Sequence, residues 1–192
     1  MIFMCFFSCL NVTANEEVLN KWKEFSHDKS SRQITDWLKL EAAACLAGSK
    51  GVKPPELKVP EFYGYNGIFV TLTLNNRVRG CYGSFYPEST DFYEITRQFL
   101  KSALRDDPRY KPLSLSEISD VTVIVTIASR PVAENDINLI DISRKGVLVQ
   151  YSDGRNFVLV PEEVRTTDYF LKKINIKEVS AVYSFDAVTI RN

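Results

Sequence analysis

The sequence predicts an α+β fold in which helices flank a largely antiparallel sheet. Two apolar segments, 67–83 and 146–160, have the pattern of β-hairpins, because each holds two strand-like runs joined by a short polar turn. Two further runs, 121–128 and 181–190, are rich in strand-forming residues and predict single strands. Helical patterns lie between these segments without the regular strand–helix alternation that is typical of a parallel sheet.

Two helices are expected before the first hairpin. Asn15 is suited to cap a helix that starts with two acidic residues, and an apolar face follows. The segment 30–33 has the form of a capping box and predicts a second helix, which we expect to end at Gly48. Glycine and proline are frequent over 48–66, which predicts an ordered loop without regular structure.

The first hairpin and the helix after it form the centre of the chain. The pair Asn75-Asn76 predicts a tight turn, because asparagine tolerates the left-handed backbone that such turns need. Ser89 or Thr90 is suited to cap a helix that runs to about Leu104.

Three cations recur every four residues on the outer side of that helix, at Arg97, Lys101 and Arg105. A stripe of this kind is usually a solvated helix face. The alternative is an anion-binding surface that continues the arginines of the hairpin.

The second half of the sequence predicts mainly β-strands. A capping box at 114–117 predicts a short helical turn, and the β-branched run 121–128 predicts a central strand. An Asp153-Gly154 turn closes the second hairpin. A short helix is expected over 167–171, and 181–190 is expected to end the fold as one strand.

Composition limits the classes of function. The chain of 192 residues carries 24 basic and 24 acidic side chains, so no overall field draws it to nucleic acid or to an anionic membrane. The four cysteines have no metal-binding or disulfide spacing, and His27 is the single histidine. The sequence therefore predicts no metal site and no cofactor. A small anionic ligand or a protein partner is favoured over nucleic acid.

The first 14 residues form an apolar leader that is far too short to span a bilayer. Residues 12–14 would serve as a signal-peptide cleavage site, yet no basic residue precedes the apolar stretch. Export, a start codon assigned too early, and a segment packed on the core are the three interpretations. We expect a cytoplasmic protein with no membrane span, with export as the alternative.

The strand that ends the first hairpin holds the main candidate site. Residues two apart in a strand share a face, so Arg77, Arg79 and Cys81 are expected to point the same way. Two guanidinium groups beside a thiol would favour the thiolate, which is the nucleophilic form. Gly80 and Gly83 would allow a ligand to approach the backbone closely. The alternative is that Cys81 is simply a small buried side chain.

Three motifs in this part of the chain resemble the AMMECR domain family. The segment 78–83, Val-Arg-Gly-Cys-Tyr-Gly, is similar to the family signature Leu-Arg-Gly-Cys-Ile-Gly. The segment 103–110 resembles the family's Asp-Pro-Arg-Phe region, and 120–126 resembles a family strand. One departure lies at 159–164, where the family has Leu-Leu-Pro-Gln-Val and this chain has Leu-Val-Pro-Glu-Glu-Val.

The resemblance implies one α+β domain of two unequal lobes, with the Arg-Gly-Cys strand near a cleft between them. We therefore expect an AMMECR-like domain over 15–192. Prokaryotic family members often occur beside Memo-type and radical-SAM proteins, which implies a shared pathway. The resemblance brings no established reaction, although a role with nucleic acid has been suggested for the family.

Three functions compete at the sequence level. The first is an enzyme in which Cys81 is the nucleophile, Arg79 lowers its pKa and holds an anionic substrate, and Asp106 or Asp107 moves the proton. The Asp107-Pro108-Arg109 segment also fits a plain helix-ending turn. The second is a non-catalytic module that binds a phosphate-bearing or acidic partner, and the third is an adaptor. The residues expected to contact a ligand are Arg77, Gly80, Gly83, Arg105 and Arg109.

Overall fold

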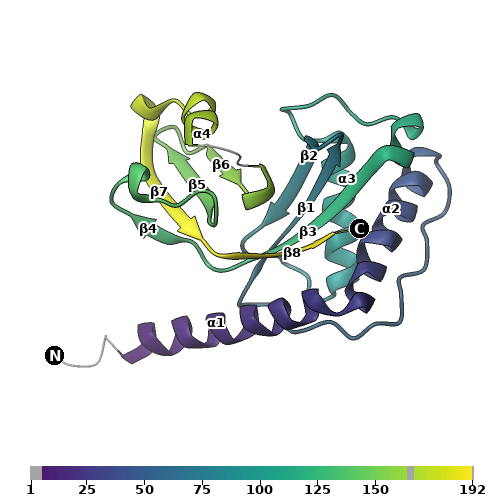
Figure 1. Cartoon of the computed structure of the whole chain (residues 1–192), viewed down its shortest axis with the longest axis horizontal. Helices are drawn as coiled ribbons and strands as arrows, with labels where there is room; N and C mark the ends of the chain where they lie inside the picture. The colour runs from purple at the N-terminus through teal and green to yellow at the C-terminus, as the bar shows by residue number, and fades with distance from the viewer. Residues whose placement is uncertain (1–5, 164–166, 192) are drawn as a thin grey trace.

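The computed structural model describes residues 6–163 and 167–191 and shows two four-stranded antiparallel sheets with flanking helices (Figure 1). The first sheet has the strand order β2-β1-β3-β8, and the second has the order β4-β7-β5-β6. The α+β class predicted from the sequence is confirmed. The β-strands are divided between two sheets rather than joined in one.

The first sheet is built on the predicted hairpin, with β1 at Gly67–Leu74 and β2 at Arg77–Ser84. Asn75 and Asn76 both have positive φ, 51° and 58°, as the sequence predicted for this turn. β3 (Val121–Ala128) pairs with the other side of β1, so the predicted central strand is confirmed. β8 (Ala187–Arg191) completes the sheet beside β3.

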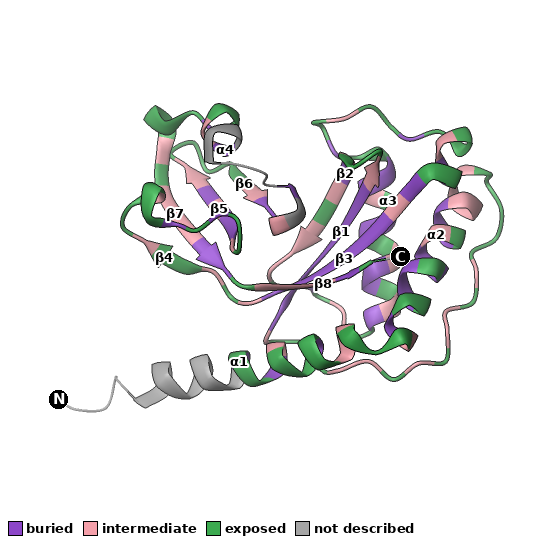
Figure 2. Cartoon of the chain, viewed as in Figure 1, coloured by how far each residue is buried: buried purple, intermediate pink, exposed green. Residues whose placement is uncertain are grey.

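Three helices cover one face of this sheet: α1 (Phe6–His27), α2 (Arg32–Leu46) and α3 (Phe92–Arg105). Their apolar side chains pack with those of β1 and β3 into the largest core of the molecule. β1 and β3 are buried along almost their whole length, because the second sheet lies over part of their other face (Figure 2).

Three helix starts differ from the sequence prediction. α1 begins at Phe6 rather than after Asn15, so Asn15 lies within the helix instead of capping it. The capping box expected at 30–33 is not formed: a 3-10 turn precedes α2, and Ser31 makes no side-chain cap bond. Asp91, not Ser89 or Thr90, caps α3 by accepting from two backbone N–H groups. The stop at Gly48 is confirmed by its φ of 66°.

The second sheet consists of β4 (Val132–Glu134), β5 (Gly146–Tyr151), β6 (Asn156–Leu159) and β7 (Val179–Phe185). The predicted hairpin of β5 and β6 is confirmed, and α4 (Thr167–Lys173) packs with this sheet in a smaller core. The strand predicted over 181–190 is instead two strands, β7 and β8, because the chain leaves one sheet at Asp186 and enters the other.

Short 3-10 turns connect several of these elements. That at Leu115–Asp120 carries the predicted capping box of Ser114 and Glu117, which is confirmed. The other 3-10 turns are Lys29–Ser31, Ile137–Leu139, Pro161–Glu163 and Ile176–Glu178.

The two sheets meet at a small apolar cluster formed by Phe69, Ala128, Val160 and Phe185. Cys81 packs against this cluster from β2. Two edge strands, β2 of the first sheet and β6 of the second, lie on facing sides of this junction (Figure 1). The candidate site lies between them.

Part of the predicted leader can be followed in the structure. Residues 1–5 lie outside the described residues, and residues 6–14 continue α1 without a break. No helix within the described ranges has both the length and the apolar character needed to cross a membrane.

Candidate functional site

Cys81 lies on β2 and faces the second sheet. Its cross-strand partner is the buried Thr71, whose hydroxyl Oγ1 lies 3.1 Å from the Cys81 sulfur. The thiol lines a cavity of about 320 Å³ between β2, the turn after α3, and β6. We call this cavity the cleft, and its lining residues are Phe69, Cys81, Tyr82, Gly83, Asp107, Pro108, Arg109, Asn156, Phe157 and Val158.

Asp107 binds the outer edge of β2. Its Oδ2 accepts a hydrogen bond of 2.9 Å from the backbone N–H of Cys81, which points away from β1 because β2 is an edge strand. Its Oδ1 accepts from the backbone N–H of Arg109 at 3.0 Å. The carboxylate, 6% exposed, thereby fixes both the strand that carries the thiol and the turn that carries the arginine.

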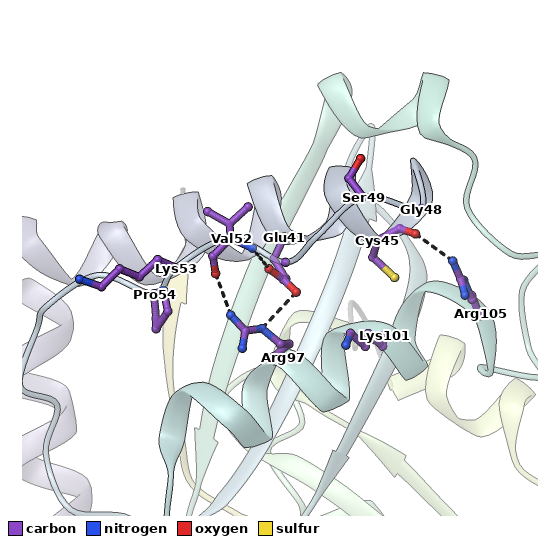
Figure 3. Close-up of a pocket in the computed structure, with 11 residues that line it drawn as sticks. Glu41, Cys45, Gly48, Ser49, Val52, Lys53, Pro54, Arg97, Lys101 and Arg105 are labelled. Atoms are coloured by element: carbon purple, nitrogen blue, oxygen red, sulfur yellow. Dashed lines mark hydrogen bonds and ion pairs between the residues drawn. The ribbon is translucent and has the colours of Figure 1, made fainter.

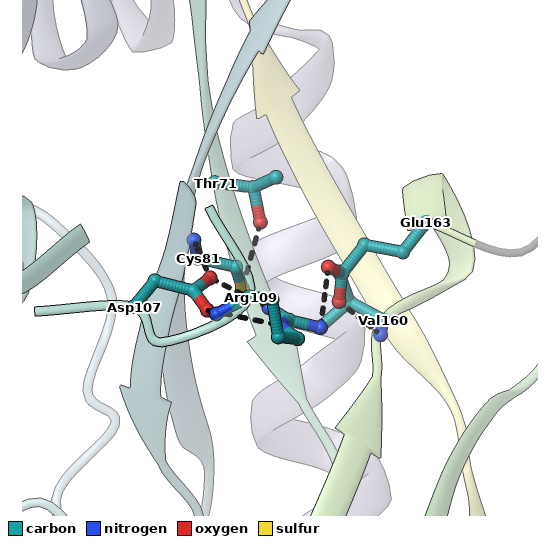
Figure 4. Close-up of polar contacts among 6 residues, drawn as sticks. All are labelled: Thr71, Cys81, Asp107, Arg109, Val160 and Glu163. Carbon is teal, nitrogen blue, oxygen red and sulfur yellow. Dashed lines mark hydrogen bonds and ion pairs between the residues drawn. The ribbon is translucent and has the colours of Figure 1, made fainter. Parts of the chain in front are cut away.

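Arg109 joins the two sheets. Its Nε and Nη2 each donate to Asp107 at 2.9 Å, which is the two-pronged geometry that an arginine makes with a carboxylate. Its Nη1 lies 3.1 Å from Oε1 of Glu163, in the 3-10 turn after β6 (Figure 4). The side chain of Arg109 remains 28% exposed, so it lies at the boundary between the cleft and solvent.

Glu163 is the deeper of the two carboxylates and is 5% exposed. Its Oε2 accepts from the backbone N–H of Val160 at a long 3.3 Å. Its Oε1 has the close contact with Arg109 but no aligned hydrogen bond within the described residues. One oxygen of a buried carboxylate is thus incompletely satisfied, in a neighbouring pocket that shares Arg109 and Phe157 with the cleft.

The pKa values of the two carboxyl groups are shifted in opposite directions. Burial raises the pKa of Glu163 above its usual 4.5, and Arg109 opposes this only in part. Burial also acts on Asp107, but the hydrogen bonds from Arg109 outweigh it and lower the pKa of Asp107. For Arg109, burial favours the neutral form, yet the hydrogen bond to Asp107 and the Glu163 carboxylate raise its pKa.

The thiolate expected from the sequence is not what the structure favours. Burial raises the pKa of the Cys81 thiol, and the nearby Glu163 carboxylate raises it further. Thr71 and Arg109 act in the other direction but do not outweigh burial. Cys81 is therefore a neutral thiol at neutral pH, chiefly because it is buried.

The expected arrangement of Arg77, Arg79 and Cys81 on one face is wrong. A bulge falls between Val78, paired with Thr73, and Gly80, paired with Leu72, so Arg79 opposes no residue of β1. Arg77 pairs with Leu74, three residues from Thr71 on β1, so Arg77 and Cys81 lie on opposite faces of the sheet.

Arg79 is engaged elsewhere. Its Nη2 binds Glu117 at 2.9 Å and its Nη1 donates to the backbone carbonyl of Lys111 at 3.3 Å. Hydrogen bonds from Ser114 and from Arg79 lower the pKa of Glu117 to about 2. Arg79 therefore holds the 3-10 turn before β3 against β2, and the cation beside the thiol is Arg109.

The two glycines of the motif allow close packing rather than the approach of a ligand. A Cβ on Gly80 would lie 1.9 Å from the backbone oxygen of Ala103, so Gly80 lets α3 press directly on β2. A Cβ on Gly83 would lie 2.3 Å from both Ile68 O and a ring atom of Phe69. Gly83 still lines the cleft, whereas Gly80 faces the helices.

Arg105 lies away from the cleft. It lines a separate pocket between α2 and α3, together with Arg97 and Lys101. The lining of this pocket includes neither Arg77 nor Arg79, the hairpin arginines that the sequence suggested as part of the same anion-binding surface.

The comparisons with known proteins agree with the motifs at the site. A sequence profile of the AMMECR1 family matches residues 39–186, which include β2, the 107–109 turn and Glu163. The chain belongs to the AMMECR1 family. The resemblance seen in the sequence motifs is confirmed.

Archaeal and bacterial proteins are among the relatives of this chain. A protein of Methanococcoides burtonii is 30% identical over 125 residues, and the chain spans 62% of that relative's length. A protein of Thermotoga maritima is 32% identical over 130 residues, which are 66% of this chain and 74% of the relative. The names of these relatives give no activity, so family membership leaves the reaction open.

A solved structure shares the fold. An uncharacterised protein from Pyrococcus horikoshii aligns with a TM-score of 0.66 at 23% identity, covering 86% of this chain and 92% of that one. At this level of identity the likeness supports the arrangement of the two sheets and the helices.

Sequence reasoning found Cys81, Asp107 and Arg109 but missed Thr71 and Glu163. The signal for Glu163 was present, because the family's Leu-Leu-Pro-Gln-Val is Leu-Val-Pro-Glu-Glu-Val in this AMMECR1-family member. Thr71 gave no signal, since a threonine in a strand is ordinary. Among the described residues no group of histidine, cysteine or acidic side chains is arranged to hold a metal ion.

Proposed function

We propose that the cleft is a cysteine-dependent catalytic site in which Glu163 takes the proton from Cys81. The observation that carries this proposal is the buried carboxyl group of raised pKa held by the same arginine that lies beside the thiol. A carboxyl group whose pKa is moved toward neutrality is suited to proton transfer. Because such a group can take the proton during the reaction, the thiol does not have to be ionised beforehand.

The proposed step conserves protons and electrons. The thiol proton of Cys81 moves to the carboxylate of Glu163 as the sulfur forms a bond to an electrophilic carbon of the substrate. The bond from that carbon to its leaving group breaks, and the leaving group takes the electron pair and then the proton from Glu163. Water or a second nucleophile afterwards releases the carbon group from the sulfur.

Asp107 and Arg109 act as positioning residues in this proposal. Asp107 fixes the backbone of Cys81 and the guanidinium of Arg109 with short hydrogen bonds. Arg109 in turn holds Glu163, in the 3-10 turn after β6, where its charge acts on the thiol. The role that the sequence suggested for Arg79 passes to Arg109, because Arg79 is paired with Glu117.

The charges favour a substrate whose reacting end is uncharged. Arg109 contacts two carboxylates, so it has little charge left for an anionic group. The cleft is also small, and its lining includes the apolar side chains of Phe69, Phe157 and Val158. Memo-type and radical-SAM proteins, which the family implies as pathway neighbours, are the first proteins to test as sources of the substrate.

The test is the rate at which iodoacetamide alkylates Cys81, measured by peptide mass spectrometry so that the other cysteines do not contribute. We expect Glu163→Gln to slow alkylation at neutral pH by at least about tenfold, since general-base assistance is commonly worth more than this. The matched control is Glu117→Gln, which makes the same chemical change at the partner of Arg79. It should leave the rate unchanged.

A second pair of variants tests which arginine matters. Arg109→Gln should change the pH profile of Cys81 alkylation, whereas Arg79→Gln should leave it unaltered. Equal rates in the wild-type protein and Glu163→Gln across the whole pH range would refute Glu163 as the proton acceptor. A thiol that no small alkylating agent reaches in the folded protein would refute catalysis by Cys81 altogether.

A further inference from the structure

A second pocket lies on the far side of α3 from the cleft. Helices α2 and α3 and the loop that follows α2 border it, and its volume is about 890 Å³ (Figure 3). This volume is within the usual range for small-molecule sites. Its charged lining consists of Glu41, Lys53, Arg97, Lys101 and Arg105.

Arg97 and Glu41 form the fixed wall of this pocket. Arg97 Nε lies 3.0 Å from Glu41 Oε1, and Arg97 Nη2 donates to the backbone carbonyl of Val52 at 2.7 Å. The other oxygen of Glu41 accepts from the backbone N–H of Val52 at 2.6 Å. These contacts hold the loop against both helices and neutralise Arg97, so Arg97 supports the pocket rather than supplying free charge.

Two cations remain without a matching carboxylate. Lys53 is paired with Glu56, just outside the pocket, and Arg97 with Glu41. Arg105 donates one hydrogen bond, to the carbonyl of Cys45 at the end of α2, and its other N–H groups stay available. Within the described part of the chain, no carboxylate lies within ion-pair distance of Lys101 or Arg105.

The spacing places these two cations together. Lys101 and Arg105 are four residues apart on α3 and so lie on the same side of the helix, one turn from each other. Figure 3 shows Arg105 reaching from α3 to the Cys45 carbonyl, and Lys101 on the same helix between Arg105 and Arg97. Like charges at this spacing repel each other and weaken the helix, and the fold does not compensate for the repulsion. A bound dianion would compensate for it.

We propose that this pocket binds the phosphate group of a small phosphate-bearing molecule through Lys101 and Arg105. Two uncompensated positive charges match the charge of a phosphate group near neutral pH. Arg105, held by the Cys45 carbonyl, presents its remaining N–H groups in a fixed fork, and Lys101 adds a mobile point charge beside it. The rest of the ligand would lie along Val52 and Pro54 on the opposite wall.

This site is separate from the proposed catalytic cleft. Gly80 packs against Ala103 of α3, and Cys81, the next residue, faces the other side of the sheet. The sheet and α3 therefore lie between the two sites. Loss of phosphate binding would leave the alkylation result at Cys81 untouched, and the reverse holds as well.

The probe for the test is inorganic pyrophosphate, titrated into the ¹⁵N-labelled full chain at low and at high salt. We expect backbone amide shifts to concentrate in 45–53 and 97–105, with binding that weakens as salt rises. Lys101→Gln and Arg105→Gln should each weaken binding about tenfold, since each removes one charged contact. Lys101→Arg should retain it. The control is Lys177→Gln, an exposed lysine on the second sheet's side of the molecule.

Three outcomes would overturn the proposal. The first is the absence of shifts at low salt, and the second is shifts that do not change in Lys101→Gln while its spectrum shows an intact fold. The third comes from a parallel titration with a single-stranded RNA oligonucleotide. If RNA binds this surface and pyrophosphate does not, the site recognises a nucleic-acid backbone and not a small phosphate-bearing ligand.

Discussion

A buried glutamate that is ion-paired to an arginine lies on each side of the first sheet, and the two carboxylates differ in their backbone hydrogen bonds. On the helix-covered side, Glu41 is 2% exposed and accepts from Val52 N–H at 2.6 Å, and its contact with Arg97 Nε at 3.0 Å is not aligned as a hydrogen bond. On the cleft face, Glu163 is 5% exposed but has only a 3.3 Å bond to Val160 N–H and an unaligned contact with Arg109.

The two ion pairs also differ in what surrounds them. The Arg97–Glu41 pair holds the loop that follows α2 onto two helices. The Arg109–Glu163 pair connects the two sheets beside a thiol, and burial raises the pKa of its carboxyl group. A buried ion pair therefore indicates a reactive site only where a buried carboxylate oxygen lacks a hydrogen bond, as Glu163 Oε1 does, and a reactive group lies next to the pair.

The largest expected effect is on the helix-covered face. Glu41→Ala would leave Arg97 without its carboxylate and free the loop that follows α2. We expect a loss of about 3 kcal/mol in the free energy of unfolding, at the lower end for a broken buried pair, because Arg97 is 31% exposed. Chemical denaturation measures it. Glu163→Ala is the matched comparison and should cost less, since Arg109 keeps Asp107.

Gly80→Ala tests the packing of α3 on β2, on the same helix-covered face of the first sheet. The added methyl group would lie 1.9 Å from the Ala103 carbonyl oxygen and force α3 away from β2. We expect a loss of about 2 kcal/mol, as for other overpacked sites. Cys81→Ala, at the next residue but on the cleft face, should cost less. If denaturation gave the reverse order, the assignment of the two faces would be wrong.

Because the pKa of the Cys81 thiol is raised, we expect the protein to lose stability in alkaline solution. The folded state raises the pKa of Cys81 above 9.0, so it favours the protonated thiol. The stability due to this preference is complete below about pH 9 and falls as pH rises further, by about 1 kcal/mol for the first pH unit. Cys81→Ser has no thiol to ionise. The difference in free energy of unfolding between the wild-type protein and this variant should therefore narrow or reverse as pH rises.

Glu163→Gln predicts the smallest change in stability and the opposite sign. Because the pKa of Glu163 is raised in the folded state, the ionised carboxylate is disfavoured there. Glutamine mimics the protonated form, so the variant should be as stable as wild type or up to about 1 kcal/mol more stable at neutral pH. The difference should vanish below about pH 4.5, where both states of the wild-type protein are protonated. Thermal unfolding at several pH values would show it.

The sequence predicted local features of this molecule better than long-range ones. The Asn75-Asn76 turn, the central strand β3 and the end of α2 at Gly48 follow from backbone preferences of single residues, and all three are confirmed. The division of 181–190 between two sheets could not be predicted, because both halves have the same strand-forming composition.

The site shows the same contrast. Cys81 and the Asp107 to Arg109 turn were found because they form compact motifs. The role given to Arg79 failed because a single bulge in β2 breaks the alternation on which it rested. Glu163 comes from a turn 82 positions further along the chain than Cys81, so only the packing of the second sheet onto the first brings it to Arg109.

The most direct test of the central claim is the titration of the Glu163 carboxyl carbon, followed by ¹³C NMR in the full-length protein. The account predicts an apparent pKa clearly above the ordinary value of 4.5, and a further change when Arg109 is replaced by glutamine. A Glu163 that titrates at or below 4.5 would contradict the account, because it would then be a fixed structural anion and a poor acceptor for the proton of Cys81.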